Sequence, residues 1–408
     1  MNDSCSFAEV ANWESRVSAA AGRLPSVDRR FRHLSLRLRA ESPGIFEWID
    51  RYHAPELRPA TDETPAFEYN CIYSDHLVSE AQHLLTESTE STSQIITDDD
   101  GLRRLDISAG ACVIYDPVRG SVVYADRDGG MFHYVYSSRT RLPACGFADV
   151  VFEPLLRTLQ SLGSTVFHAG AVMTPHGAIL IVGYGSDGKT TLVSGLIPEG
   201  FPFVANERCF IDQQHGSFYV TAFPAWHNIG LGTALQHPGL ARLLPVPDDV
   251  TAPQRRFDRK RVAATEPQEW AGLSDKLALV TDEFTSKLRA PDAVSHVPLL
   301  GVVRPRVSHT PVSPQITVVP HRDRLQLIGE NYLSPYKERV HHPDWMNFCV
   351  SEIMPDVHGL GRLPAVEYTF SLQDGRIHGT QHATQDLVES LAAAASMTTH
   401  ATEHRTRP

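Results

Sequence analysis

The chain has 408 residues, and its 42% hydrophobic and 21% charged content is that of an ordinary globular protein. A net charge of −11 leaves no excess of basic residues, which argues against a general affinity for nucleic acid. No apolar stretch approaches bilayer length, and no secretion signal is recognisable, so we expect no membrane partner. The six cysteines are scattered without short-spaced pairs, which is typical of a reduced, soluble, cytoplasmic protein.

Residues 1–148 are expected to form an N-terminal domain of mixed α+β structure. Residues 7–23 have apolar positions at helical spacing, whereas residues 102–138 alternate in a period of two and predict a small antiparallel sheet. Residues 87–100 are rich in Ser, Thr and Asp and predict an exposed loop. The basic run over residues 29–39 is interpreted as a solvated face.

Residues 149–397 are expected to form a second domain, of the α/β class, so that the chain is α+β overall. An amphipathic helix is predicted over residues 149–162, with Pro154 in its first turns, where a missing N–H does little harm. A strand is predicted over residues 166–173, with His168 in its middle. The tail over residues 398–408 is expected to be disordered.

The most informative stretch begins with four apolar residues, Ile179 to Val182, which predict a buried strand. Gly183 then precedes four residues, Gly188, Lys189 and Thr190, and the apolar pattern that follows is helical. This is the pattern of a phosphate-binding loop in its expected context of strand, loop and helix. Glycines let successive N–H groups converge on phosphate oxygens, and the helix adds the positive end of its dipole.

This pattern predicts nucleotide binding. Lys189 can neutralise the β- and γ-phosphates, and the Thr190 hydroxyl can hold Mg²⁺. The alternative, a glycine-rich turn with an incidental Lys-Thr, would arise in only about one chain in a hundred of this length. Asp187 is unusual, because it puts a negative charge beside the phosphates. The residues expected to bind the nucleotide are Gly183, Gly185, Ser186, Asp187, Gly188, Lys189, Thr190 and Thr191.

The segments around this loop resemble the catalytic core of the HPr kinase/phosphorylase family, and especially its smaller relatives from natural-product gene clusters. The resemblance rests on Val-Phe-His-Ala-Gly-Ala at 166–171, on the loop, and on Phe-Val-Ala-Asn-Glu-Arg at 203–208. It is good over residues 164–212 and weak from there to about residue 395. It implies a phosphoenolpyruvate-carboxykinase-like P-loop kinase core and transfer of phosphate from ATP, with Mg²⁺, to a hydroxyl.

Carried over residue by residue, the resemblance implies that His168 lies beside the site of phosphate transfer. Lys189 matches the family's phosphate-contacting lysine, and Thr190 matches its metal-contacting Ser/Thr. Asn206 falls where the family has an aspartate that helps to deprotonate the acceptor hydroxyl, and Glu207 falls on a second aspartate near the metal. An amide cannot accept a proton, so the base at position 206 is lost.

The chemistry tolerates this loss, because phosphoryl transfer needs charge neutralisation and in-line positioning more than a strong base. Thr190 and Glu207 are the expected metal ligands, and Glu207 alternatively orients the acceptor or is an exposed glutamate at a strand end. His168 is either a base or hydrogen-bond partner of the acceptor, or a core histidine. Arg208 either pairs with Glu207 or contacts phosphate.

Further candidates follow along the chain. A loop-rich insertion is expected at about 236–270, and its basic cluster at 255–261 is either a solvated loop or a lid over the phosphates. Arg304 and Arg306 end a predicted strand on the ligand side of the sheet. Two aromatic residues line the acceptor pocket or belong to the core; these are Trp226 and His227.

The leading hypothesis is an ATP- and Mg²⁺-dependent kinase for a hydroxyl of a small molecule, such as a nucleoside or sugar intermediate of a biosynthetic pathway. The alternatives are a peptide or protein Ser/Thr kinase and a non-catalytic ATP-binding regulator, the latter favoured by Asn206. The absence of a recognisable peptide-binding element favours the small molecule. The sequence leaves open the acceptor, the general base, the reverse reaction and whether the protein forms homo-oligomers.

Overall fold

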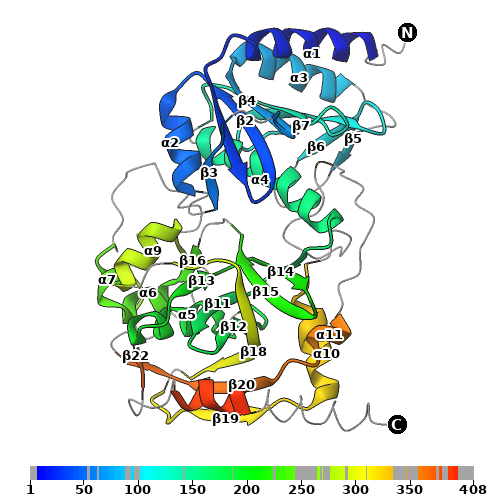
Figure 1. Cartoon of the computed structure of the whole chain (residues 1–408). Coiled ribbons are helices and arrows are strands. Elements are labelled where there is room, and N and C mark those ends of the chain that lie inside the picture. Colours follow the sequence, from blue (N-terminus) through cyan, green and yellow to red (C-terminus); the bar gives the residue numbers. More distant parts are fainter. Residues whose placement is uncertain are drawn as a thin grey trace, which may run out of the picture. The chain divides into compact units, whose positions relative to one another are not determined.

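The computed structural model describes residues 7–52, 56–61, 64–87, 93–95, 102–140, 143–185, 187–223, 227–243, 264–266, 269, 276–289, 293–308, 310–333, 346, 357–373, 376–378 and 385–393. The chain forms two compact units of mixed α and β structure, which confirms the coarser part of the expected fold class (Figure 1). Unit 1 comprises Met1–Leu162 and Pro335–Glu352, and unit 2 comprises Gly163–Ser334 and Ile353–Pro408. No helix within the described ranges is long and apolar enough to cross a membrane.

Unit 1 is built on one mixed sheet, whose described strands lie in the order β3-β1-β2-β4-β9-β8-β7-β6-β5. Strand β4 pairs in parallel with both β2 and β9, and the remaining neighbours are antiparallel. The strands are β1 (Ser26–Phe31), β2 (Leu34–Ala40), β3 (Leu57–Pro59), β4 (Phe67–Tyr73), β5 (Ser93–Ile95), β6 (Arg103–Asp106), β7 (Ala111–Asp116), β8 (Ser121–Asp126) and β9 (Met131–Tyr136).

Strands β6 to β9 are the antiparallel hairpins that the alternating sequence predicts, but they do not form a separate small sheet. They continue a larger mixed sheet, because β9 also pairs with β4. Strand β5 lies inside the segment 87–100, so the expectation of a loop over that whole segment was wrong.

Helices cover both faces of this sheet (Figure 1). The helices are α1 (Phe7–Ala21), α2 (Pro43–Tyr52), α3 (Asp75–Glu87) and α4 (Pro143–Ser161). Successive side chains of a strand point to opposite faces, and β9 shows both environments. Val135 packs in a cluster with Trp13 of α1 and Leu77 of α3, whereas the Tyr134 ring stacks on Phe147 of α4 at 6.3 Å between centroids.

Helix α4 places the boundary between the units after residue 162, later than the expected position at 148/149. Its 19 residues form one helix that contacts α2, β4 and β9 of unit 1, so a boundary at 148 would cut through it. Pro154 therefore lies inside the helix and not in its first turns. Glu153 and Arg157 flank this proline, both are buried, and their side chains form an ion pair at 2.7 Å.

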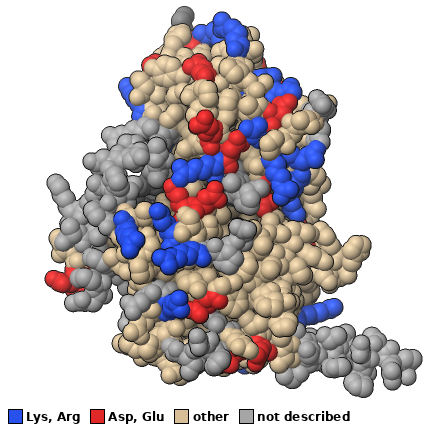
Figure 2. Space-filling view, turned by 60° about the vertical axis from the view of Figure 1, so that its left-hand side comes forward, with Lys and Arg blue, Asp and Glu red and all other residues tan. Residues whose placement is uncertain are grey.

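The basic run of unit 1 is neutralised by carboxylates instead of forming a solvated basic face. The Arg29 guanidinium donates two hydrogen bonds of 2.6 Å to the Asp50 carboxylate, and Arg37 pairs with Asp28 at 2.9 Å. On the surface that Figure 2 displays, Lys and Arg side chains are interspersed with Asp and Glu. This distribution fits the absence of an excess of basic residues in the sequence.

Unit 2 is built on a branched mixed sheet whose central strand is β18 (Val297–Val307). Its path runs β10-β14-β15-β18-β12-β11-β13, and β20 also pairs with β18 and carries β19. Strand β18 is antiparallel to β15 and parallel to both β12 and β20. The other strands are β10 (Thr165–Phe167), β11 (Gly170–Thr174), β12 (Gly177–Ile181), β13 (Phe203–Ala205), β14 (Cys209–Gln214), β15 (Ser217–Ala222), β16 (His227–Gly230), β17 (Lys276–Leu279), β19 (Gln315–Val318), β20 (Ala365–Phe370), β21 (Leu372–Gln373) and β22 (Arg376–Ile377).

The single strand predicted over residues 166–173 is two strands in the structure. Strand β10 ends at Phe167 and pairs with β14, whereas β11 begins at Gly170 and pairs with β12 and β13. His168 and Ala169 form the break between them, so His168 does not lie in the middle of a strand. The mostly apolar run of residues continues across the break, which is why the pattern suggested one strand.

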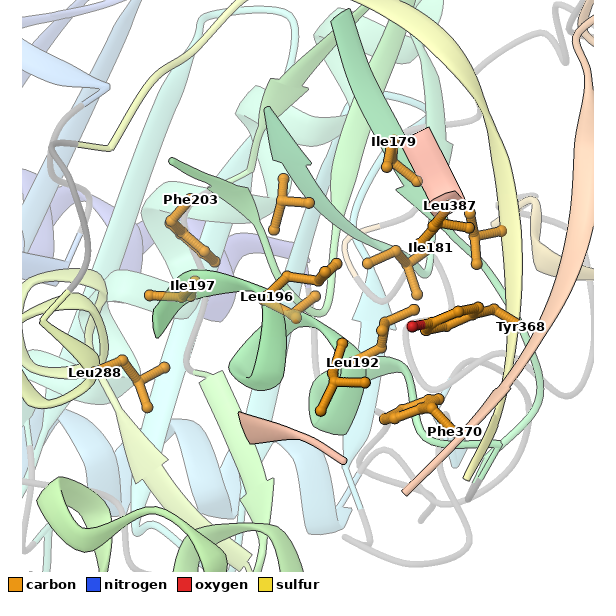
Figure 3. Packing of buried hydrophobic residues seen from close by; sticks show 14 of the residues in the cluster. Ile179, Ile181, Leu192, Leu196, Ile197, Phe203, Leu288, Tyr368, Phe370 and Leu387 are labelled. Carbon is orange, nitrogen blue, oxygen red and sulfur yellow. The ribbon is translucent and has the colours of Figure 1, made fainter. Parts of the chain in front are cut away.

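Strand β12 is buried on both faces and joins the two halves of the core of unit 2. The helices of this unit are α5 (Lys189–Leu196), the 3₁₀ helix η1 (Ile197–Glu199), α6 (Leu231–Gln236), α7 (Pro238–Ala241), α9 (Thr281–Leu288), α10 (His321–Asn331), α11 (Val357–Leu360) and a helix over residues 385–393. Ile179 and Ile181 pack with Leu192 of α5 (Figure 3), while Leu180 packs with Leu327 of α10. Helices α5 and α10 therefore pack against opposite faces of β12.

A buried histidine in unit 1 makes the stability of this unit sensitive to acid. His133 of β9 is fully buried, its Nε2 lies 3.3 Å from the Ser18 hydroxyl of α1, and its ring is 5.7 Å from that of Tyr124. Burial, together with the smaller effect of the positive charge of Arg39, lowers the pKa of His133 to about 4. The folded state therefore disfavours the proton that the unfolded chain binds near its ordinary pKa of 6.5.

We predict that the free energy of unfolding falls by about 2 kcal/mol through His133 between pH 7 and pH 5. The stabilisation is present above the unfolded pKa of 6.5 and is lost as the pH falls towards the folded pKa of about 4. Urea unfolding of the His133→Asn variant, compared at the two pH values, should show a smaller loss than wild type. The same change at exposed His76 is the control, and equal pH dependence of the His133 variant and wild type would contradict the prediction.

Candidate functional site

The loop between β12 and α5 depends on a glycine at the start of the helix. Gly188 precedes the first helical residue and has φ = 98°, a left-handed backbone conformation that residues other than glycine rarely adopt. A Cβ at this position would lie 3.0 Å from Cβ of Val307 in β18. Gly188 therefore allows both the turn and the close approach of the loop to β18.

The Lys189 side chain folds back onto the start of this loop. Its ammonium group donates hydrogen bonds to the carbonyl oxygens of Gly183 at 2.7 Å and Tyr184 at 3.1 Å. Burial lowers the pKa of Lys189, and the negative charges of Glu207 and Asp187 oppose this effect. The ammonium group is thus held at the carbonyl oxygens where the loop turns.

Asp187 has four partners that explain how the loop tolerates its negative charge. Its Oδ2 accepts a hydrogen bond from the Tyr184 amide at 3.0 Å, and it lies 3.5 Å from Nε of Arg304. Its Oδ1 lies 3.8 Å from the Arg306 guanidinium. Lys189 adds a further positive charge nearby. Sequence reasoning placed Arg304 and Arg306 on this side of the sheet, and the structure brings both to the loop.

Strand β13 brings a second set of residues to the start of α5. The Thr190 hydroxyl donates to Oδ1 of Asn206 at 3.3 Å, and Asn206 follows the last residue of β13. Asn206 is 1% exposed, and within the described residues its Nδ2 has no hydrogen-bond partner. A buried amide donor without a partner is rare, because it costs about 1–3 kcal/mol of desolvation. The amide therefore marks a place where a ligand oxygen would be stabilised.

Glu207, the next residue, has a strained backbone. Its φ of 77° lies in the left-handed region, which costs a residue other than glycine roughly 1–2 kcal/mol. Its Oε1 accepts a hydrogen bond from the Asn228 amide at 3.2 Å. Burial raises the pKa of Glu207, and the positive charges of Lys276, Arg208 and Lys189 oppose that rise. Strain of this kind persists where surrounding contacts hold it, which is common at functional sites.

His168 is connected to the loop through Asn331, the last residue of α10. The His168 amide donates to the Asn331 carbonyl at 3.0 Å, and Oδ1 of Asn331 accepts from the Gly183 amide at 2.9 Å. The Asn331 amide group donates to the Leu327 carbonyl at 2.8 Å, and Asn331 is 4% exposed. Asn331 thus fixes the first glycine of the loop. Sequence reasoning missed it, since the only signal was a polar residue following an apolar stretch in a helix.

Two further residues of the site were missed because they come from β17 and α6. Lys276 begins β17, opposite Gly230 of β16, and its charge acts on both Glu207 and Lys189. The Thr191 hydroxyl forms a hydrogen bond of 2.7 Å with the Thr233 hydroxyl. Nothing in the sequence spacing indicates that these residues meet.

His227 belongs to the core and does not line an acceptor pocket. It is 2% exposed, its ring lies 5.2 Å from both Phe203 and Phe284, and its Nε2 lies 3.0 Å from the Thr281 hydroxyl. Burial lowers its pKa to about 4. Other expected site residues lie outside the described residues; these are Ser186, Trp226 and the basic cluster at 255–261.

The donor set fits a magnesium ion that shares its ligands with a phosphate chain. The described residues hold no group of three or more His, Cys, Asp or Glu side chains that would bind a metal by themselves. Mg²⁺ commonly uses one or two protein oxygens, several waters and substrate phosphates. Thr190 Oγ1 and the Glu207 carboxylate are oxygen ligands suited to such a site, and Asn206 Oδ1 lies beside Thr190.

We predict that Gly188→Ala destabilises the protein more than Gly200→Ala does. Both glycines have a left-handed φ, 98° and 95°, but a Cβ at Gly200 meets nothing within 4 Å, whereas one at Gly188 meets Val307. Gly200→Ala should cost about 1 kcal/mol for its backbone, and Gly188→Ala should cost about 1–3 kcal/mol more for the contact. Urea unfolding measures both, and equal losses would show that the contact with β18 is unimportant.

The geometry of this site comes from the strand–loop–helix at β12 and α5 together with the ends of β13, β18 and α10. No protein-family model matches the chain, and no curated protein matches it.

Proposed function

We propose that unit 2 is an ATP- and Mg²⁺-dependent phosphotransferase with a phosphoenolpyruvate-carboxykinase-like P-loop kinase core. The γ-phosphate is transferred to a hydroxyl of a small molecule. The observation that carries the proposal is the contact between Thr190, at the start of α5, and Asn206, directly before Glu207 at the end of β13. This contact supports the proposal because it joins the loop that binds phosphates to the carboxylate that serves the metal or the acceptor.

The residues of the loop have separate parts in this reaction. The backbone amides at the N-terminus of α5 bind phosphate oxygens, because they lie at the positive end of the helix dipole. Lys189 neutralises the β- and γ-phosphates from its position at the loop carbonyls. Thr190 and Glu207 would hold the magnesium ion, which when bound would offset the negative charge that develops on the transferred group.

The acceptor hydroxyl is positioned at the end of β13. Asn206 cannot accept a proton, but its Nδ2, which has no hydrogen-bond partner among the described residues, can donate to an oxygen of the acceptor or the phosphate. Glu207 holds the metal through water or orients the acceptor, and the rise of its pKa on burial makes it a better proton acceptor than an ordinary glutamate. The positive charges of Lys276 and Arg208 act on Glu207, and His168 is proposed as a further hydrogen-bond partner of the acceptor.

A second candidate function is a non-catalytic ATP-binding regulator. The specific observation in its favour is Asn206, because the resemblance places a proton-accepting aspartate at this position. A screen for turnover decides between the two functions. Purified protein with MgATP is incubated with pools of hydroxyl metabolites and of Ser/Thr peptides, and products are searched by mass spectrometry for an added phosphate. Nucleotide binding without any product would favour the regulator, and a peptide product would favour a peptide kinase.

We predict that Lys189→Ala lowers turnover at least a thousandfold, because it removes the cation that neutralises the β- and γ-phosphates. The measurement is phosphate transfer to an acceptor found in the screen, or hydrolysis of MgATP if no acceptor is found. Lys287→Ala on the exposed surface of α9 is the matched control and should keep the wild-type rate. Wild-type activity of the Lys189 variant would disprove the phosphate-binding role of the loop.

We predict that Glu207→Gln lowers kcat/KM at least a hundredfold. The carboxylate acts in its ionised form, so kcat/KM of the wild type should fall as the pH drops through the pKa of Glu207. Because burial raises this pKa above its ordinary value of 4.5, the acid limb should lie at higher pH than an exposed glutamate would give. Glu199→Gln, at the end of η1, is the control and should leave the pH profile of kcat/KM unchanged. If this control also lost the acid limb of the profile, the limb could not be attributed to Glu207.

A further inference from the structure

The Asp187 carboxylate lies inside the loop that the proposed function assigns to phosphates. A Cβ built on Gly183 would lie 2.8 Å from Oδ2 of Asp187 and 3.0 Å from its Cβ, so the side chain folds tightly over this glycine. Oδ2 also accepts a hydrogen bond from the Tyr184 amide at 3.0 Å. The carboxylate thus uses a backbone donor at the position where such loops bind phosphate oxygens.

The cations around Asp187 are those that a phosphate would attract. Arg304 lies 3.5 Å from Oδ2 of Asp187, and Arg306 lies 3.8 Å from its Oδ1. Both arginines also reach one oxygen of Glu367, at 3.5 Å and 3.1 Å. All four of these distances exceed the 2.7–2.9 Å of a strong charged hydrogen bond, so the arginines are loosely held.

A third contact of Arg304 also holds it near the loop. Its guanidinium carbon lies 5.5 Å from the centre of the Tyr184 ring, within the range of a cation–π interaction. Two arginines and two carboxylates leave this cluster neutral as long as Asp187 remains in it. A phosphate bound beside Asp187 would repel the carboxylate, whereas guanidinium groups bind phosphate in a strong two-pronged arrangement.

We propose that Asp187 is an internal anion that occupies part of the phosphate site in the nucleotide-free protein. The nucleotide displaces its carboxylate, and Arg304 passes from Asp187 to the phosphates. This inference rests on the proposed function, because it requires that the loop binds a nucleoside triphosphate. It adds Arg304 of β18 to the residues that bind phosphate. It also implies that the Asp187 carboxylate competes with the phosphates for the same site, which lowers the affinity for nucleotide.

The first test compares the affinity of the full chain for MgATP in wild type and Asp187→Asn, measured by calorimetry. The asparagine oxygen still accepts from the Tyr184 amide, so the loop keeps its shape and loses only the charge. We expect binding at least tenfold tighter. Asp212→Asn is the matched control, because Asp212 also accepts a side-chain hydrogen bond, from Ser164 at 2.6 Å, but lies on β14. Equal or weaker binding by the Asp187 variant would overturn the proposal.

The second test asks whether Arg304 binds phosphate or only neutralises Asp187. Arg304→Gln is introduced into the Asp187→Asn protein, where no carboxylate remains at position 187. If Arg304 passes to the nucleotide, the double variant should bind MgATP at least tenfold more weakly than Asp187→Asn alone. Unchanged affinity would overturn the transfer. Urea unfolding of each variant ensures that a loss of affinity does not come from a loss of fold.

The outcomes separate this inference from the proposed function. If wild type and Asp187→Asn bind MgATP equally and Lys189→Ala abolishes both, the loop binds nucleotide and only the inference fails. If Asp187→Asn binds MgATP where wild type shows no binding, the inference is supported in its strongest form. If neither protein binds any nucleoside triphosphate, the proposed function and the inference fail together.

Discussion

The parallel pairing of β12 with β18 is the constraint on which the candidate site depends. In the observed register, Leu180 of β12 lies beside Val302 of β18 and Ile181 lies beside Val303. That register puts Gly188 against Val307 and carries Arg304 and Arg306 to Asp187. The loop, the lysine and the charge cluster therefore follow from one strand pair.

The site brings several unfavourable features together around one loop. Glu207 has a left-handed backbone, Asn206 has a buried amide without a described partner, and Lys189 and Glu207 both have pKa values displaced by burial. Each feature costs stability by itself, and the rigid packing around β12 and α5 holds them in place. Their coincidence around one loop is what favours a reactive site over an ordinary turn.

Local sequence patterns were sufficient to predict individual strands, helices and the loop. They could not predict which elements distant in the sequence pair with one another. The apolar strand, the glycines and Lys189 lie within a dozen residues, so their spacing was sufficient to predict the loop. The two arginines that pair with Asp187 come from β18, more than a hundred residues later, and Asn331 comes from α10. The break at His168 was also missed, because pairing with different strands, and not a change in hydrophobicity, separates β10 from β11.

The hydrogen bond from Gly183 to Asn331 spans 148 positions, and this separation has a consequence for the order of folding. During synthesis β12 and α5 emerge long before β18 and α10. The loop between β12 and α5 therefore lacks its hydrogen bond to Asn331 until α10 has been made. Contacts this distant in sequence form slowly, because a long loop of chain must close first. The capacity to bind a ligand at this loop would therefore appear among the last properties that the chain acquires as it folds.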